Sequence, residues 1–170
     1  MTVQRSEILD LLHLLAARLA ADGLTGEMYV VGGAAIALTF DERRSTRDID
    51  AVFEPKRAIY EAAAEIARER GLDEGWLNDA VKGFLTGPDE GAIPVLDVPG
   101  LSVATASPRI ILAMKVLAHR PGEDDADVRL LAGQLGLTSA ADVLAVATEV
   151  YGDRLDAAAQ FFVEELFPET

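Results

Sequence analysis

The sequence predicts an α/β (α+β) protein, with an α/β front half and a helical bundle as its back half. Up to residue 106, short apolar segments of strand length alternate with segments of helical periodicity. From Ser107 onward only helical periodicity is present. We therefore expect two lobes, residues 1–106 and residues 107–170, packed as one compact unit.

The front half is predicted to begin with a helix over residues 6–21. Leucine and isoleucine recur there at helical spacing, and Gly23 follows as a stop signal. The next predicted elements are a strand at Glu27–Val31, a helix at Gly33–Leu38, a charged loop at Asp41–Ser45 and a strand at Arg47–Phe53.

Proline and glycine mark the next boundaries. Pro55 is placed to begin an alanine-rich helix that runs to Arg70 and stops at Gly71. The chain is irregular over residues 71–91, and two strands are expected around the Pro99-Gly100 turn. Those strands are predicted at Ile93–Val98 and Leu101–Ala104.

The back half reads as consecutive helices. Ser107 is predicted as an N-cap with Pro108 in the first helical position, and Ser139 with Asp142 fits a capping box. The predicted helices cover residues 108–119, 124–135, 140–150 and 153–166.

Composition limits the possible functions. The chain has 170 residues, half of them hydrophobic, and no cysteine, which excludes disulfides, thiolate metal sites and a cysteine nucleophile. No apolar run of signal-peptide or membrane-spanning length is present, so a cytoplasmic protein with no membrane partner is expected. The net charge of −14 means that a nucleic-acid partner would need a local basic patch.

Two aspartates lie on alternate positions of the second predicted strand. Asp48 and Asp50 would share one face, about 7 Å apart, where two carboxylates repel each other. A divalent cation such as Mg²⁺ would remove that cost, since it takes oxygen ligands and commonly bridges carboxylates to phosphates. The alternative is that this face of the strand is simply exposed to water.

A glycine pair favours the metal interpretation. Gly32 and Gly33 lie after a predicted strand and before a predicted helix. Without side chains there, a phosphate can approach backbone N–H groups and the positive end of the helix. The pair and the two aspartates together predict a nucleotide site.

Lys115 stands in the middle of a helix that is apolar on nearly every side. A buried ammonium group is costly unless an anion meets it. Its charge either faces nucleotide phosphates, or it snorkels to the surface, or it forms an internal ion pair with a nearby aspartate. His119 is expected to be an ordinary residue of the helix end.

The order of strand, Gly32-Gly33, helix and the R-x-T-x-D-x-D run from Arg44 to Asp50 resembles the nucleotidyltransferases of the DNA polymerase β superfamily. More closely, the chain from about Tyr29 to Leu131 resembles the AbiEii-type toxins of bacterial toxin-antitoxin systems. This resemblance implies a small mixed sheet, Mg²⁺ (or Mn²⁺) as cofactor, and transfer of a nucleoside monophosphate from an NTP to a hydroxyl.

The resemblance also implies roles for residues. Asp48 and Asp50 would bind the metal, and Lys115 and Asp127 would complete the catalytic set, with Asp124 as the rival of Asp127. Nucleotide phosphates would be bound by Gly32, Gly33, Arg44, Thr46, Lys115 and Arg120.

Three further residues, Asp97, Asn78 and Asp79, are candidates for the site. Asp97 is the best candidate for a third carboxylate, but it precedes Pro99-Gly100 and is as well explained as a turn residue. Asn78 or Asp79 is expected to line the cleft, whereas Trp76 is expected to pack in the core.

The sequence therefore favours a metal-dependent, toxin-like nucleotidyltransferase with tRNA or a protein as acceptor. A cognate antitoxin and a homodimer are possible partners through the helices after Leu137. The alternatives are a degenerate fold that binds a nucleotide or a partner without chemistry, and a small-molecule adenylyltransferase.

Overall fold

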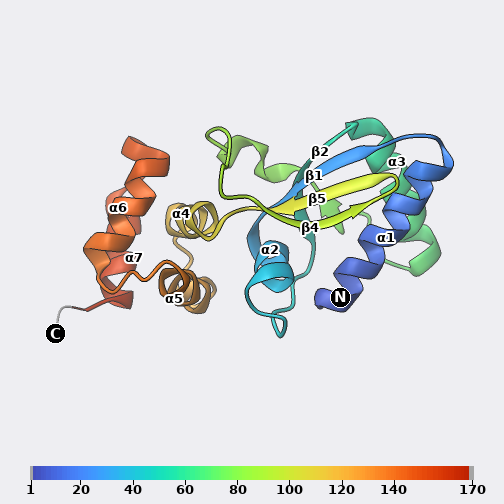
Figure 1. Ribbon diagram of the computed structural model, residues 1–170. Coiled ribbons are helices and arrows are strands. Elements are labelled where there is room, and N and C mark those ends of the chain that lie inside the picture. Colours follow the sequence, from blue (N-terminus) through green and yellow to red (C-terminus); the bar gives the residue numbers. More distant parts are fainter. Residues whose placement is uncertain (1, 169–170) are drawn as a thin grey trace. The chain divides into compact units, whose positions relative to one another are not determined.

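The computed structural model describes residues 2–168 in two units (Figure 1). Unit 1 contains the chain up to Leu85 together with Gly91–Ala106. Unit 2 contains Thr86–Glu90 together with the chain from Ser107 onward. Within residues 2–168, no helix has both the length and the apolar character needed to cross a membrane.

Unit 1 is built on a mixed five-stranded sheet in the order β3-β2-β1-β5-β4. β1 pairs antiparallel with β2 and parallel with β5, while β2–β3 is parallel and β4–β5 antiparallel. The predicted mixed α/β class is confirmed. The strands are β1 (Gly26–Val30), β2 (Ile49–Glu54), β3 (Leu77–Asn78), β4 (Ile93–Val98) and β5 (Leu101–Thr105).

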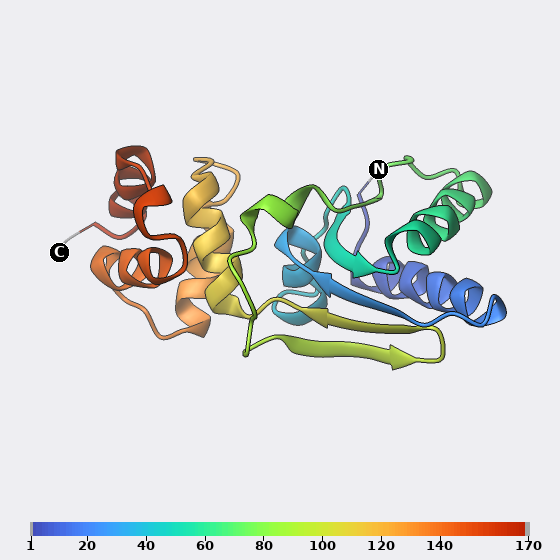
Figure 2. The same cartoon turned by 90° about the horizontal axis from the view of Figure 1, so that it is seen from above.

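One face of this sheet forms the core of unit 1. Along β2, Ile49, Ala51 and Phe53 are buried, and the residues between them are not. Helices α1 (Arg5–Ala21) and α3 (Lys56–Arg70) lie on the buried face (Figure 2). Asp50 lies on the opposite, more open face of the sheet.

Trp76 anchors the segment that leads into β3. Its indole Nε1 donates a hydrogen bond to the carbonyl of Ala63 at 3.0 Å, and the side chain is buried. The predicted core role of Trp76 is confirmed. Trp76 also contributes the carbonyl that accepts from the Ile49 N–H at 2.7 Å, so it determines where β2 begins.

The prediction that a strand starts at Arg47 is wrong, because β2 starts at Ile49. Before it, Thr46 pairs with Val3 in an isolated antiparallel bridge, and residues 47–48 form a bend. Asp48 therefore precedes the ladder, and its position depends on this bend and on its side-chain contacts.

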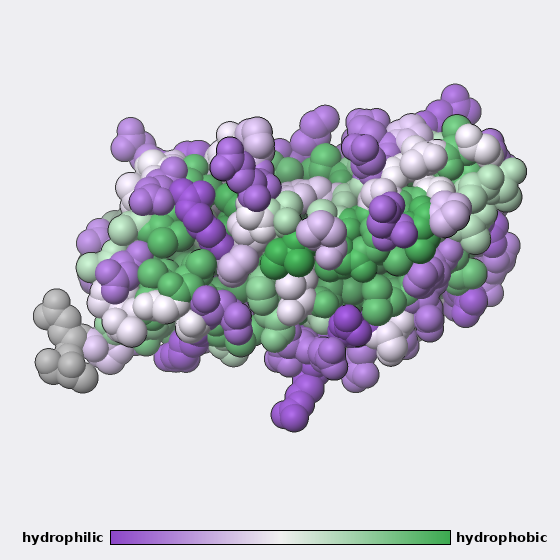
Figure 3. All heavy atoms as spheres, viewed as in Figure 1, coloured by the Kyte–Doolittle hydropathy of each residue, from purple (hydrophilic) through white to green (hydrophobic). Residues whose placement is uncertain are grey.

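The edge strand β4 leaves part of its apolar surface uncovered. Ile93, Val95, Leu96 and Val98 are all half-exposed. Where Figure 1 draws α2 (Gly32–Thr39) and β4, apolar side chains reach the surface in Figure 3, with hydrophilic groups around them. β4 is an edge strand of the sheet and pairs with β5.

Unit 2 is helical, as predicted. The prediction of one helix over residues 153–166 is wrong, because residues Gly152–Arg154 form a short 3₁₀ turn and the helix begins after Asp156. The Asp156 carboxylate accepts from the Ala159 N–H at 2.9 Å and caps that start. The helices are α4 (Pro108–Ala118), α5 (Asp125–Gln134), α6 (Ala140–Tyr151) and α7 (Ala157–Leu166).

Candidate functional site

Asp50 and the glycine pair meet where β1 ends and α2 (Gly32–Thr39) begins. The Val31 N–H donates to the backbone carbonyl of Asp50 at 2.9 Å, which places the end of β1 beside Asp50. A Cβ atom added to Gly32 would lie 3.4 Å from Asp50 Oδ2. The Asp50 carboxylate therefore lies against the first residue of α2.

Gly33 faces the loop that carries the other predicted contacts. A Cβ atom there would lie 3.0 Å from Thr46 Oγ1, which is shorter than most contacts that Cβ atoms make. Thr46 Oγ1 in turn donates to the backbone carbonyl of Asp48 at 3.0 Å. The structure thus brings Gly32, Gly33, Thr46, Asp48 and Asp50 together in unit 1, as their spacing in the sequence suggested.

The start of α2 suits an anion. Its N-cap, Val31, has no side chain that caps the first turn, and the first turn carries no acidic residue. The N–H groups of such a turn and the helix dipole attract phosphate oxygens. The predicted phosphate role of Gly32 and Gly33 stays a prediction that this geometry suits.

We expect Gly32→Ala to impair nucleotide binding beyond its effect on stability. Gly32 has φ +63°, a conformation that costs a residue with a side chain about 1–2 kcal/mol. Gly23→Ala is the matched control, since Gly23 has φ +69° and open space around it. Urea unfolding should report similar losses for both variants, while calorimetric titration with an NTP analogue should show weaker binding for Gly32→Ala alone. Equal nucleotide affinities would contradict this.

Arg44, the other predicted phosphate contact of the loop, sits in a turn that begins at Asp41. The Arg44 N–H donates to the Asp41 carbonyl at 3.0 Å, and the Arg43 N–H donates to Asp41 Oδ1 at 3.0 Å. The turn holds Arg44 two residues before Thr46 with its side chain half-buried. Its phosphate contact remains a prediction.

Asn78 and Asp79 face different partners. Asn78 pairs with Asp50 in the β2–β3 register, and its Nδ2 donates to Asp48 Oδ2 at 3.4 Å. Asp79 instead accepts from the Tyr60 hydroxyl at 2.6 Å and forms an ion pair with Lys56. Of the two residues, Asn78 is the one that belongs to the candidate site.

The Asp79 contacts involve two residues that sequence reasoning missed. The hydrogen bonds from Lys56 and then Tyr60 hold the pKa of the Asp79 carboxyl below its usual value. Burial, followed by the hydrogen bond to Asp79, raises the pKa of Tyr60. Both residues lie one turn apart on α3, and that spacing was the signal that could have paired them with one carboxylate.

The donor set near Asp50 fits a hard divalent cation. Asp48 and Asp50 are both half-buried and supply carboxylate oxygens, which Mg²⁺ and Mn²⁺ accept together with water and phosphate oxygens. Among residues 2–168, no group of three or more histidine, cysteine, aspartate or glutamate side chains is placed to hold a metal. Asp48 and Asp50 would supply carboxylate ligands to a cation bound here.

Asp97 lies far from this pair of carboxylates. In the sheet register, Asp97 pairs with Ser102, Ser102 with Glu27, and Glu27 with Glu54, so these four residues form one row across the sheet. This row lies about 13 Å from Asp50 along the strands, and β4 lies about 14 Å from β2 across the sheet. Asp97 is therefore roughly 20 Å from Asp50. Asp97 accepts from the Ser102 hydroxyl at 2.9 Å, which agrees with a structural role beside the turn.

A hollow of about 510 Å³ covers the open face of the sheet. Its floor includes Tyr29, Val52 and Ala104, which are opposite one another across β2, β1 and β5. This row lies between the row of Asp50 and the row of Glu54. The hollow is lined by Glu27, Met28, Tyr29, Val52, Phe53, Glu54, Pro94, Leu96, Asp97, Ser102, Val103 and Ala104.

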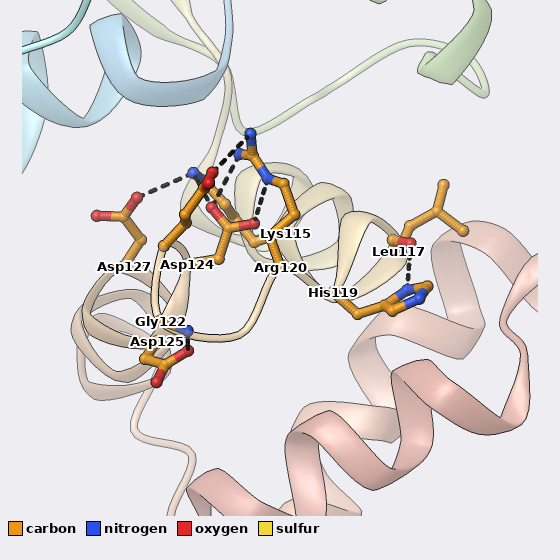
Figure 4. Close-up of polar contacts among 9 residues, drawn as sticks. Lys115, Leu117, His119, Arg120, Gly122, Asp124, Asp125 and Asp127 are labelled. Carbon is orange, nitrogen blue, oxygen red and sulfur yellow. Dashed lines mark hydrogen bonds and ion pairs between the residues drawn. The ribbon is translucent and has the colours of Figure 1, made fainter.

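In unit 2, Lys115 is buried in an internal cluster of charges (Figure 4). Its Nζ lies 2.6 Å from Asp124 Oδ1 and 2.9 Å from Asp127 Oδ2, and both carboxylates are buried. Arg120 adds two hydrogen bonds to Asp124, at 2.9 and 3.0 Å. Of the possibilities that the sequence left open for Lys115, the internal ion pair is present, and both rival aspartates take part in it.

The cluster explains why Asp124 remains charged although it is buried. Burial raises the pKa of its carboxyl, but the hydrogen bonds from Arg120 and Lys115 more than offset this, and the pKa lies below its usual value. His119 ends α4 as its C-cap, as expected, and its Nδ1 lies 2.9 Å from the Leu117 carbonyl. His119 takes no part in the ion pairs shown in Figure 4.

We expect the stability that Asp124 provides to depend on acid pH. Because its folded pKa is lowered, this stability is fully present above the unfolded value of about 4 and is lost as pH falls through the folded value. Urea midpoints measured from pH 7 to pH 3 should show wild type more stable than Asp124→Asn, with the difference shrinking below about pH 4. A difference that stays constant over that range would contradict this.

Comparison with known proteins gives two matches. Residues 7–152 match the family described as "Nucleotidyltransferase of unknown function (DUF6036)". Among solved structures, the crystal structure of an antigenic nucleotidyltransferase-like protein from Paracoccidioides brasiliensis is similar, with a TM-score of 0.50 and 18% identity over 94% of this chain and 95% of that one. At that identity the likeness shows the fold. No curated protein matches the sequence.

Proposed function

Since the chain belongs to this nucleotidyltransferase family, we propose that it is a metal-dependent nucleotidyltransferase that moves a nucleoside monophosphate from an NTP to an acceptor hydroxyl. The observation that carries the proposal is the meeting of Asp48 and Asp50 with Gly32-Gly33 at the start of α2. Carboxylates alone would repel a triphosphate. Carboxylates beside an anion-binding helix start suit a triphosphate that arrives with its cation.

Each part of unit 1 has a defined task in this proposal. The first turn of α2 binds phosphate oxygens through backbone N–H groups, and Gly32 and Gly33 keep the approach open. Asp48 and Asp50 would hold Mg²⁺ or Mn²⁺, which would supply positive charge to offset the negative charge of the phosphate oxygens. Thr46 fixes the bend that carries Asp48.

The hollow on the open sheet face favours a protein or small cationic acceptor over tRNA. Glu27, Glu54 and Asp97 line it, and no lysine or arginine of the described chain does. Such a surface repels the phosphates of a nucleic acid, in agreement with the net charge of −14. An acceptor lying over Tyr29 and Val52 would extend toward Asp50, since Val52 and Asp50 are successive residues of that face.

We also propose a toxin role with a cognate antitoxin, and this part rests on the resemblance of the sequence to AbiEii-type toxins. The predicted phosphate contacts of Lys115 and Arg120 would draw these cations from the ion pairs with Asp124 and Asp127. A fold that binds a nucleotide without chemistry is the competing function.

The experiment is a transfer assay with each of the four labelled NTPs and Mg²⁺. Total tRNA, lysate protein, basic peptides that contain serine or threonine, and aminosugar acceptors are tested in parallel. Label on a peptide, protein or cationic small molecule supports the proposal, and label on tRNA would overturn its acceptor preference. Nucleotide binding without label on any acceptor would favour the non-catalytic alternative.

A further inference from the structure

Asn78 is fixed in position by its neighbours on both sides. Leu77, the other residue of β3, is buried at 1% exposure, and Trp76 before it is buried in the core. Because side chains alternate along a strand, Asn78 faces the same side as Asp50, its partner in the register. Asp79 after it is held by Lys56 and Tyr60, and the Asp79 N–H donates to the Tyr60 hydroxyl at 3.2 Å.

The orientation of the Asn78 amide follows from its contacts. Its Oδ1 accepts from the Ala80 N–H at 3.2 Å. A backbone N–H can only donate, so the amide oxygen must lie on this side and Nδ2 on the other. Nδ2 therefore presents its hydrogens to Asp48 Oδ2, at 3.4 Å.

Asp48 needs such a contact more than Asp50 does. Asp50 is held by the β2 ladder, whereas Asp48 lies in the bend before the strand begins. Thr46 Oγ1 holds the backbone of Asp48 through its carbonyl, and this hydrogen bond does not orient the carboxylate. The Asn78 amide supplies a constraint at the carboxylate itself.

We propose that Asn78 is a positioning residue, which holds Asp48 Oδ2 by hydrogen bonding and so presents Oδ1 to the divalent cation. This inference rests on the proposed metal-dependent function and adds a residue to it. Partners that orient a metal ligand in this way are commonly worth 10–100-fold in metal affinity. Asn78 acts through Asp48 and does not touch the reacting atoms.

The test measures Mn²⁺ affinity in the full-length protein by electron paramagnetic resonance, with a non-hydrolysable NTP analogue present. We expect Asn78→Ala to weaken Mn²⁺ binding by about 10-fold or more. Asn78→Ser keeps a hydrogen-bond donor on a shorter side chain, so its Mn²⁺ affinity should lie between those of wild type and Asn78→Ala. Thermal unfolding without metal should show that both variants remain folded.

Asp79→Asn is the matched control, because it removes a carboxylate charge next to Asn78 but keeps the backbone N–H and a side-chain oxygen for Tyr60, which hold this segment. It should bind Mn²⁺ as wild type does. Equal weakening by Asp79→Asn, or unchanged affinity in folded Asn78→Ala, would overturn the inference and leave the proposed function standing. Absence of Mn²⁺ binding by the wild-type protein would overturn both.

Discussion

Asp48→Asn and Asp50→Asn are each expected to lower nucleotidyl transfer by about 1,000-fold or more. A bound cation contributes several kcal/mol to stabilising charge in such a reaction, and each 1.36 kcal/mol is tenfold in rate. The side chains keep their shape in both variants, so folding should be little affected. The measurement is the initial rate of label transfer at saturating NTP and Mg²⁺.

Asp10→Asn serves as the control for this pair of variants, since Asp10 is an exposed carboxylate on α1. It should transfer label at the wild-type rate. If Asp48→Asn and Asp50→Asn retain most of the wild-type activity, these carboxylates do not hold a catalytic cation.

Lys115→Met is expected to destabilise the protein by about 3–5 kcal/mol. The substitution keeps the length of the side chain but removes the ammonium group that contacts the buried carboxylates of Asp124 and Asp127. Removing one partner of a buried ion pair is costly because an uncompensated charge stays behind. Urea unfolding at pH 7 measures the loss, and Arg57→Ala, which breaks an exposed pair with Glu61, should change little.

A double-mutant cycle separates the structural role of Lys115 from a catalytic one. Lys115→Met combined with Asp127→Leu should be less destabilised than the sum of the single variants, because both members of the Lys115–Asp127 ion pair are then removed. A loss below about 1 kcal/mol for Lys115→Met would contradict the structural role. Transfer by folded Lys115→Met then tests the predicted phosphate contact independently of stability.

The candidate site of unit 1 follows closely from local sequence signals. Gly32-Gly33, which follow one strand, and Asp50 on a second strand become neighbours once the two strands pair, and the connecting helix is short enough to bring them together. Side-chain alternation then gives the face of Asp50. These steps use contacts between segments that are close in the sequence.

The remaining features depend on contacts between distant segments. The start of β2 at Ile49, which leaves Asp48 in a bend, is set by the carbonyl of Trp76. The distance of Asp97 from Asp50 depends on the pairing of β1 with β5, which no local pattern reveals. The partners of Lys115 depend on how α4 packs on α5, so the sequence could only offer alternatives for it.

In the proposed function, Asp48 and Asp50 together hold the cation of a bound NTP. Crystals grown with Mn²⁺ and a non-hydrolysable NTP analogue test it directly through the anomalous signal of manganese. We expect an anomalous peak about 2–2.5 Å from carboxylate oxygens of both Asp48 and Asp50, with the triphosphate at the start of α2. A nucleotide bound elsewhere, or Mn²⁺ held by other side chains, would contradict it.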